Sequence, residues 1–318
     1  MGRQLELFAA PAPRVPELDF AAERELAARL PPHVRFGTSS WTFPGWAGIV
    51  YPPGTSEREL LARGLELYAR HPLLRTVGID RSYYAPLDRE TLARYAGSLP
   101  PGFRAVMKVW SEITSAVDNK TREPNPRFLS VEHCQEHVLG PVREAFLEHA
   151  GPLVFELPPL RRSELPEPRA FAARLSGFFA QLPGELQYAV ELRNRELLTH
   201  AYLDALAERG VGHVLNFWER MPDIGAQLDI PGVLTAPFVV ARLLIPPGQR
   251  YDDRKRSLAP FDRIVDAQEK MRTDIERLAE ACEKLGKVLL VIVNNKAEGS
   301  SPLTVRALAE RLARPRAP

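Results

Sequence analysis

Eight short apolar segments of this sequence each end in polar side chains that could take part in binding or catalysis. These side chains are the acids Asp80, Glu156 and Glu191, the bases Lys108, Arg193 and Arg242, and the neutral groups Thr38, Ser40, Asn216, Asn294 and Asn295. Burying a charge costs free energy unless the charge is paired, so pairing among these groups could simply close a core. Polar groups at all eight ends exceed what closure requires, and we therefore expect a ligand or catalytic site there.

Several chemistries are open to the charged members of this set. Lys108 beside carboxylates could lose its proton on burial and act as a base or Schiff-base nucleophile, or it could form a structural ion pair with Glu156 or Glu191. Glu156 and Glu191 could form an acid/base pair of the glycosidase type. Asp80, Glu156 and Glu191 could hold Mg²⁺ through oxygen ligands. We take Asp80, Lys108, Glu156 and Glu191 as the catalytic candidates.

Other residues of the set are expected to bind substrate. Arg193 and Arg242, together with Lys108, would suit a phosphate or carboxylate, because guanidinium groups match the geometry of these anions. Aromatic side chains near the same ends could stack on a base or a sugar ring, or could seal the mouth of the fold. The expected substrate-binding residues are Ser40, Trp41, Tyr83, Tyr84, Arg193, Asn216, Arg242, Asn294 and Asn295.

The apolar segments alternate with longer amphipathic ones from residue 34 onward. They are too short for helices and rich in Val, Leu and Phe, as strands covered on both faces are. We predict strands over residues 34–40, 76–80, 103–109, 153–157, 188–193, 213–217, 239–244 and 288–294. Ser56 and Glu59, at capping-box spacing, begin one of the intervening helices. Another is predicted over residues 261–286, ending at Gly286, with an apolar stripe of Ile264, Met271, Ile275, Leu278 and Leu285.

Eight strand–helix units in a row favour a closed, TIM-type (β/α)8 parallel barrel, an α/β fold, over an open doubly wound sheet. The sequence has no glycine-rich strand-to-helix turn of the dinucleotide type, so we expect no nicotinamide or flavin cofactor. In a barrel of this kind the chemistry lies at the carboxyl ends of the strands, where the polar residues fall. Residues 18–318 would form this single barrel domain, with an extra helix over residues 18–30 that could cover the barrel bottom.

Composition limits the classes of protein that need to be considered. The net charge of +2 and the sequence pI of about 8.5 are less basic than those of an obvious nucleic-acid binder. Cys134 and Cys282 do not suggest a disulfide framework. No apolar run reaches the length of roughly 18 residues that a membrane span needs, and no signal peptide begins the chain. We expect a cytoplasmic protein that does not bind membranes.

Two short motifs have alternative explanations. "HCQEH" matches a zinc-protease pattern with His133, Glu136 and His137. It falls on a helix outside the expected site and has no evident third ligand, so we interpret it as a solvated helix face. The run "RKR" at 254–256 follows the seventh strand and could bind phosphate, although Asp252 and Asp253 offset its charge and a solvated face is the more usual explanation of such a run.

Five blocks of the sequence, taken in order, resemble the signature blocks of a known family. They are "FGTSSWTFPGWAGIVYPPG", "TVGIDRSYYAPLDRETLARYAGSLPPGFRAVMKV", "GPLVFELPP", "YAVELRNREL" and "VIVNNKAEGSSPLT". The family is that of domain of unknown function 72, the YecE-like proteins, and the resemblance covers about residues 34 to 310. It implies a TIM-type barrel and no established activity. The family's characteristic polar residues resemble Ser40, Trp41, Tyr84, Lys108, Glu191, Arg193, Arg242, Asn294 and Asn295.

The sequence departs from the family pattern at several of these ends. Asp80-Arg81 stands where the family usually has Asn-Ser, and Glu156 stands where it usually has Gln. Asn216 replaces an Asp of the sixth strand, and the His that usually follows the seventh strand is missing from "ARLLIPPGQRYDD". The chain therefore resembles a divergent branch of the family, and its substrate does not follow from the resemblance.

The first 17 residues have the pattern of a flexible, Pro-rich tail that carries a binding peptide. Gln4, Leu5, Leu7 and Phe8 in "QLELF" resemble the peptide by which bacterial repair and replication proteins hold the DNA sliding clamp. An extended peptide offers apolar anchors to a groove, and the prolines that follow space it from the barrel. Alternatively, Leu5, Leu7 and Phe8 could fold back onto the first helix.

Three functions follow from these observations. If the tail binds the clamp, the barrel is a hydrolase or lyase that acts on a phosphate-bearing or nucleic-acid substrate in DNA repair. Otherwise it acts on a small sugar or anionic metabolite, or it has lost activity and serves as a binding module. A basic mouth with Mg²⁺ would favour the first function, a closed pocket the second, and a mouth filled by pairs between Lys108 and glutamates the third.

Overall fold

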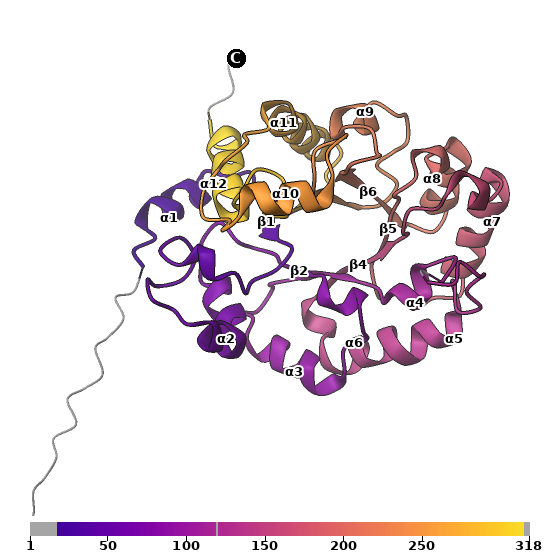
Figure 1. Ribbon diagram of the computed structural model, residues 1–318, viewed down its shortest axis with the longest axis horizontal. Coiled ribbons are helices and arrows are strands. Elements are labelled where there is room, and N and C mark those ends of the chain that lie inside the picture. Colours follow the sequence, from indigo (N-terminus) through magenta and orange to yellow (C-terminus); the bar gives the residue numbers. More distant parts are fainter. Residues whose placement is uncertain (1–17, 119, 315–318) are drawn as a thin grey trace, which may run out of the picture.

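The computed structural model describes residues 18–118 and 120–314, which form a parallel β-barrel surrounded by helices (Figure 1). The sheet runs in the order β1-β8-β7-β6-β5-β4-β3-β2, and all named pairs are parallel. Backbone hydrogen bonds from Arg75 and Thr76 to the Phe36 carbonyl oxygen bring the segment before β2 against β1. The barrel is therefore nearly closed, which confirms the predicted TIM-type fold.

The eight strands lie where the apolar segments predicted them, with ends that differ by a few residues. They are β1 (Val34–Thr38), β2 (Gly78–Ile79), β3 (Ala105–Lys108), β4 (Ala150–Glu156), β5 (Tyr188–Glu191), β6 (Gly212–Phe217), β7 (Phe238–Leu243) and β8 (Val288–Val293). β5 ends at Glu191, so Arg193 lies in the loop that follows rather than in the strand. β1 and Thr76 approach so closely that a Cβ on Gly37 would lie 2.2 Å from the Thr76 carbonyl oxygen, which explains why glycine occupies this position.

The helices follow the strands around the outside of the barrel. They are α1 (Ala21–Ala28), α2 (Glu57–Ala69), α3 (Arg89–Gly97), α4 (Ser111–Thr114), α5 (Val131–Cys134), α6 (Gly140–Ala145), α7 (Pro168–Phe179), α8 (His200–Ala207), α9 (Ile224–Leu228), α10 (Tyr251–Leu258), α11 (Glu269–Lys284) and α12 (Ser301–Leu312). The Ser56 side chain accepts a hydrogen bond from the backbone N–H of Glu59, so the predicted cap of α2 is present.

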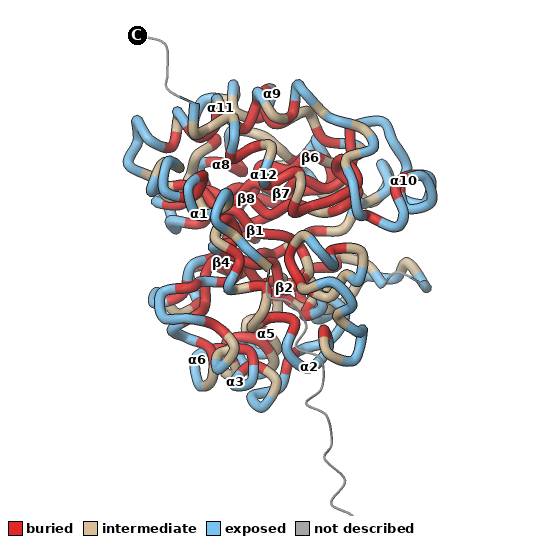
Figure 2. Tube along the Cα trace, turned by 90° about the vertical axis from the view of Figure 1, so that its left-hand side faces the viewer, coloured by how far each residue is buried: buried red, intermediate tan, exposed pale blue. Residues whose placement is uncertain are grey.

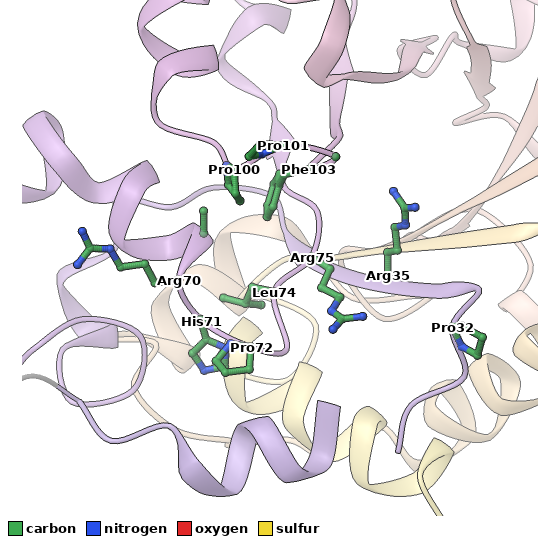
Figure 3. Close-up of a pocket in the computed structure, with 12 residues that line it drawn as sticks. Pro32, Arg35, Arg70, His71, Pro72, Leu74, Arg75, Pro100, Pro101 and Phe103 are labelled. Atoms are coloured by element: carbon green, nitrogen blue, oxygen red, sulfur yellow. The ribbon is translucent and has the colours of Figure 1, made fainter. Parts of the chain in front are cut away.

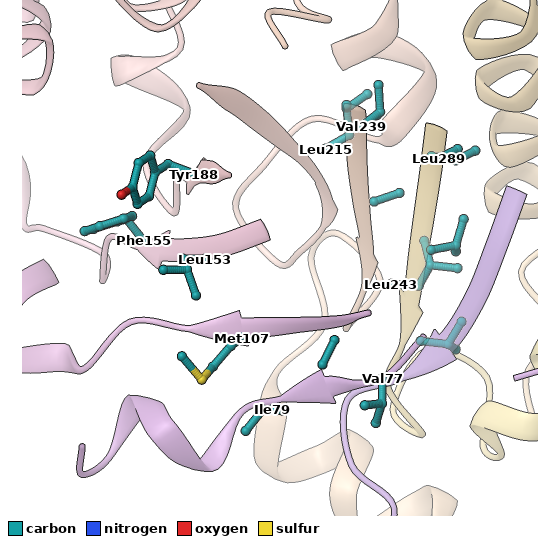
Figure 4. Packing of buried hydrophobic residues seen from close by; sticks show 14 of the residues in the cluster. Val77, Ile79, Met107, Leu153, Phe155, Tyr188, Leu215, Val239, Leu243 and Leu289 are labelled. Carbon is teal, nitrogen blue, oxygen red and sulfur yellow. The ribbon is translucent and has the colours of Figure 1, made fainter. Parts of the chain in front are cut away.

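Buried side chains divide into two clusters along the strands, and Figure 2 shows how burial concentrates there. Met107, Leu153 and Phe155 belong to the larger cluster, part of which is shown in Figure 4. Val106 and Val154, which alternate with them in sequence, belong to the smaller one. Successive strand residues point to opposite faces of a sheet. The smaller cluster therefore fills the barrel interior, and the larger one lies between the strands and the helices.

One helix prediction needs correction. The predicted helix over residues 261–286 begins only at Glu269, because the backbone N–H groups of Val265 and Gln268 donate to Glu298 instead of forming helical hydrogen bonds. Leu285, expected in its apolar stripe, is exposed. The extra helix predicted over residues 18–30 is present as α1, which packs beside α12, where Glu23 pairs with Arg306 at 3.0 Å.

Candidate functional site

The alternation of side chains along the strands gathers the expected polar residues in one layer of the barrel. In each of β3 to β7, the last residue of the interior cluster is followed two positions later by a polar residue at the carboxyl end of the strand. These residues are Lys108, Glu156, Glu191, Asn216 and Arg242. Because a period of two keeps a side chain on the same face, all five point inward above the apolar core.

Arg242 lies at the centre of an ion-pair network. Its Nη1 atom is 2.5 Å from Glu191 Oε2 and 3.2 Å from Glu156 Oε2, and its Nη2 atom is 2.6 Å from Asp80 Oδ2. The arginine side chain is 1% exposed, and Glu191 is fully buried. The three acids offset the cost of burying the charge of this guanidinium group, because a buried charge is destabilising unless it is paired. Burial alone lowers the pKa of Arg242, but Asp80, Glu191 and Glu156 outweigh burial and raise it.

Arg193 connects the two glutamates from the other side. Its Nη2 atom is 2.7 Å from Glu156 Oε2 and 2.8 Å from Glu191 Oε1. Its guanidinium carbon lies 3.9 Å from the centre of the Trp218 ring, which is a close cation–π contact. The Nε and Nη1 atoms of Arg193 are buried and have no hydrogen-bond partner among the described residues. Trp218 was missed by the sequence analysis, and its position just after β6 was the signal that could have found it.

Lys108 closes the network on its solvent side. Its Nζ atom is 2.7 Å from Glu156 Oε2 and 3.6 Å from Asp80 Oδ2, and it lies 4.9 Å from the centre of the Tyr83 ring. A lysine nucleophile has to be a free amine, whereas Lys108 forms ion pairs with two carboxylates. Tyr83 stacks edge-on against Tyr84, whose side chain is 79% exposed. The expected aromatic pair therefore flanks the network, and Tyr84 faces solvent.

The network contains three acids, Asp80, Glu156 and Glu191, and three bases, Lys108, Arg193 and Arg242, so its formal charge is zero. Burial raises the pKa of Glu156, but the charges of Arg193, Lys108 and Arg242 outweigh burial and hold it well below its usual value. Glu156 is therefore a carboxylate at neutral pH. The pKa of Tyr83 is raised, first by burial and then by the charge of Glu156.

Three of the remaining predicted residues hold the structure together around this layer. Asn216 donates from Nδ2 to the Leu192 carbonyl oxygen at 2.8 Å, with a longer contact of 3.4 Å to Glu191 Oε1. Asn294 donates to Ser39 Oγ at 2.8 Å. Asn295 Oδ1 accepts hydrogen bonds from the indole N–H of Trp46 and from Ser301 at the start of α12. Asn295 thus positions a helix and is buried away from solvent.

Ser40 and Trp41 do not join the network. The Ser40 hydroxyl is 3.5 Å from that of Thr42. Trp41 is 9% exposed and packs edge-on against Tyr95 of α3, with ring centres 5.2 Å apart, and its carbonyl oxygen accepts from the Tyr51 hydroxyl. The indole is part of the core between the strands and helices. Trp41, which was expected to stack on a substrate ring or to seal the mouth, thus packs in the core against α3.

A second polar group at the mouth was not anticipated. Lys296 Nζ lies 4.5 Å from the centre of the Tyr251 ring of α10 and 3.3 Å from Asn294 Oδ1. In the run "RKR", Arg254 is buried and donates to the Lys296 and Ala297 carbonyl oxygens and to Asp266. Only the other two members of the run, Lys255 and Arg256, are exposed. The run therefore anchors α10 through one arginine.

The described residues hold no group of three or more His, Cys, Asp or Glu side chains arranged to bind a metal ion. In the "HCQEH" motif, His133 bonds to Ser130 Oγ at 3.0 Å, and the His137 ring packs edge-on against Trp110. A Mg²⁺ ion held by Asp80, Glu156 and Glu191 would have to displace the cations that now contact these carboxylates. Over the same residues, no helix is long and apolar enough to span a membrane. Gln4, Leu5, Leu7 and Phe8 lie outside the described residues.

Together, the nearly closed parallel sheet and the polar layer at its carboxyl end define a (β/α)8 barrel protein with a charge-balanced mouth. A family model described as "Protein of unknown function DUF72" matches residues 35–318, and the chain belongs to this family. The resemblance seen in the sequence is thereby confirmed. Membership assigns no activity.

Solved structures of the family are similar in fold. A DUF72 family protein from Enterococcus faecalis shares 17% sequence identity with a TM-score of 0.56, covering 90% of this chain and 97% of that one. Another from Thermotoga maritima shares 17% identity with a TM-score of 0.60, covering 88% and 99%. No curated protein matches this chain. At this level of identity the likeness shows the fold alone.

Proposed function

We propose that the mouth of the barrel binds a small, neutral, polyhydroxylated molecule such as a sugar. The observation that carries this proposal is the charge balance of the ion-pair network. The solvent-facing members, Asp80, Lys108 and Glu156, offer hydrogen-bond acceptors and donors side by side, within a six-residue network whose formal charge is zero. Hydroxyl groups both donate and accept, so a sugar can satisfy these groups, whereas a phosphate would meet two carboxylates with no free cation between them.

The same geometry favours binding over glycoside hydrolysis. A glycosidase needs one protonated carboxyl group as general acid. The lowered pKa of Glu156 removes it from that role. Both carboxylate oxygens of Glu191 already contact cations, Oε1 with Arg193 at 2.8 Å and Oε2 with Arg242 at 2.5 Å, so neither oxygen faces a leaving group. The proposal therefore combines two of the functions derived from the sequence: a small sugar as the ligand, and a barrel that serves as a binding module without catalysing a reaction.

This proposal is tested by titrating the full-length protein with neutral sugars and with the corresponding sugar phosphates, each with and without Mg²⁺. We expect a neutral sugar to bind and to raise the melting temperature, because a ligand that binds only the folded state stabilises it. Tyr84→Ala should weaken binding roughly tenfold, since the exposed ring is the available stacking surface. Isothermal titration calorimetry measures the change.

Leu61→Ala is the matched control, because Leu61 is equally exposed but lies on α2, outside the network. It should leave the dissociation constant unchanged. Lys108→Met tests whether a ligand occupies the mouth. If only the sugar phosphates bind, and Lys108→Met abolishes that binding, the mouth is an anion site and the proposal is wrong. Binding that requires Mg²⁺ would instead favour the carboxylate-held metal.

A second candidate is a hydrolase or lyase acting on a nucleic-acid substrate in DNA repair. Two observations favour it: the clamp-like peptide "QLELF", and the exposed basic residues Arg250, Lys255 and Arg256 in and before α10. α10 follows β7 and so lies at the carboxyl end of the barrel (Figure 1). In this proposal the tail holds a bacterial sliding clamp and α10 faces the phosphates.

The clamp proposal predicts that the purified protein binds a bacterial sliding clamp through its tail. Leu7→Ala/Phe8→Ala should abolish this binding, because the two apolar side chains are the anchors that would enter the clamp's groove. Surface plasmon resonance against immobilised clamp measures it, with Leu61→Ala as the control. Absence of binding by the wild type at about 50 μM, or equal binding by the variant, would contradict the proposal.

A further inference from the structure

The cavity at the amino-terminal pole of the barrel is lined by arginines that point away from one another. It has a volume of about 400 Å³, and Arg35, Arg70 and Arg75 contribute to its wall (Figure 3). Their guanidinium groups diverge in this view and do not converge on one ligand. Leu74 and Phe103, which also line the cavity, are 1% and 6% exposed and offer almost no apolar surface. Converging donor atoms lie elsewhere, beside the mouth.

Two histidine rings beside the mouth lie at a separation that one metal ion could bridge. His133 belongs to α5, and His137 belongs to the π-helical turn (Gln135–Leu139) that continues this helix. Residues four apart in a helix are neighbours on one face, and the two ring centres are 5.9 Å apart. Two imidazoles bound to one tetrahedral ion have ring centres roughly 5 Å apart, so a side-chain shift of about 1 Å would bring both rings onto the ion.

The surroundings of each ring favour a bound cation. His133 Nδ1 is 3.0 Å from the hydroxyl oxygen of Ser130, which caps α5, and Nε2 is the nitrogen that faces away from this contact. Metal-binding histidines usually have such a partner on their other ring nitrogen, because it fixes the orientation of the ring. The His137 ring packs edge-on against Trp110, with ring centres 5.6 Å apart. His137 Nε2 lies 3.9 Å from a carboxylate oxygen of Glu136, whose negative charge attracts a cation.

The position of the pair also distinguishes it from an ordinary exposed helix face. π-helical turns are rare and occur frequently at functional sites. His137 lines a small cavity together with Ser82 and Lys108, which is part of the ion-pair network. Trp110, which packs against His137, follows Lys108 by two residues. The motif that the sequence analysis placed outside the expected site therefore lies next to it.

We infer that His133 and His137 form a two-histidine site for Zn²⁺ or a similar divalent transition-metal ion, with water in the remaining coordination positions. Imidazole nitrogens bind Zn²⁺, Cu²⁺ and Ni²⁺ well, whereas Mg²⁺ prefers oxygen ligands. Two protein ligands are fewer than the group of three that the described residues lack. Coordination positions held by water leave the ion open to exchange ligands. The site depends on neither the sugar proposal nor the clamp proposal.

The test is calorimetric titration of the full-length protein, without an affinity tag, with Zn²⁺ in the presence and absence of excess Mg²⁺. We expect one Zn²⁺ ion to bind per chain with a dissociation constant of about 100 μM or below, and Mg²⁺ to leave this binding unchanged. His133→Gln and His137→Gln should each weaken Zn²⁺ binding at least tenfold, because each variant leaves a single imidazole at the site.

Tryptophan fluorescence tests the site without changing either histidine. Ni²⁺ bound to His137 would lie close to the Trp110 ring and should quench its emission. Trp110 is one of four tryptophans, so the quenching should be partial. Trp110→Phe keeps an aromatic ring against His137 and should remove this part of the quenching. Quenching that is the same in Trp110→Phe and in the wild type would place the ion elsewhere.

His200→Gln is the matched control, because His200 is an exposed histidine on α8 and does not belong to the pair. It should leave Zn²⁺ binding unchanged. Three calorimetric results would overturn the inference: no binding of Zn²⁺ at about 1 mM, loss of Zn²⁺ binding in excess Mg²⁺, or equal affinity in the wild type, His133→Gln and His137→Gln. Equal loss in His200→Gln and His137→Gln would overturn it as well.

Discussion

Arg242→Met is expected to lower the free energy of unfolding by about 3–5 kcal/mol. The guanidinium group contacts Asp80, Glu156 and Glu191, and its removal leaves Glu191, which is fully buried, with Arg193 as its remaining cation. A buried carboxylate that loses a partner bears a desolvation cost that its remaining contacts do not offset. Urea unfolding followed by circular dichroism measures the loss.

Two further variants distinguish the stability contribution of the buried Arg242–Glu191 pair from that of Lys108, which borders solvent. Lys108→Met should cost only about 1 kcal/mol, because Lys108 borders solvent and Glu156 keeps both arginines. Arg242→Met/Glu191→Met should recover part of the stability lost in Arg242→Met, since it removes the unpaired acid together with its partner. If Arg242→Met and Lys108→Met cost the same, the network is not organised around Arg242.

Acidification from pH 6.5 to pH 4 is expected to destabilise the protein by several kcal/mol through two buried histidines. Burial lowers the pKa of His213 to about 4, and burial together with the charge of Arg306 lowers that of His71 to about 4, from an ordinary value of 6.5. Between these values the unfolded chain binds protons that the folded protein excludes. The stabilisation is therefore present above pH 6.5 and is lost as the pH falls towards 4, with each ring contributing on the order of 3 kcal/mol.

Urea titrations at pH 7, 6, 5 and 4.5 measure this dependence. His71→Asn and His213→Gln should each flatten the slope of unfolding free energy against pH, whatever they cost in absolute stability. Glu156 does not affect the result between pH 7 and pH 4.5. Because its pKa is lowered, the stability that it contributes is lost only as the pH falls below the ordinary carboxyl pKa of 4.5. A wild-type stability that stays constant from pH 6.5 to 4.5 would contradict the assignment of neutral, buried rings.

Much of the candidate site could be predicted because a strand has a side-chain period of two. Once Val154 and Ala189 face the barrel interior, Glu156 and Glu191 must face it too, whatever the rest of the chain does. The same regularity held for Lys108 and Arg242. Residues in loops had no such constraint. Trp41, only three positions beyond β1, turned into the core against Tyr95, a residue 54 positions away that the local sequence could not indicate.

The sequence by itself determined the eight-stranded barrel, the place of its strands, and the set of charges at their carboxyl ends, because these depend on local periodicity. Only the tertiary structure decided how those charges pair, with Arg242 reaching Asp80 across 162 positions of the chain. It also decided that the three acids and three bases at the mouth lie close enough to offset one another. Pairing depends on distances between side chains from distant strands, and no local pattern of residues contains those distances.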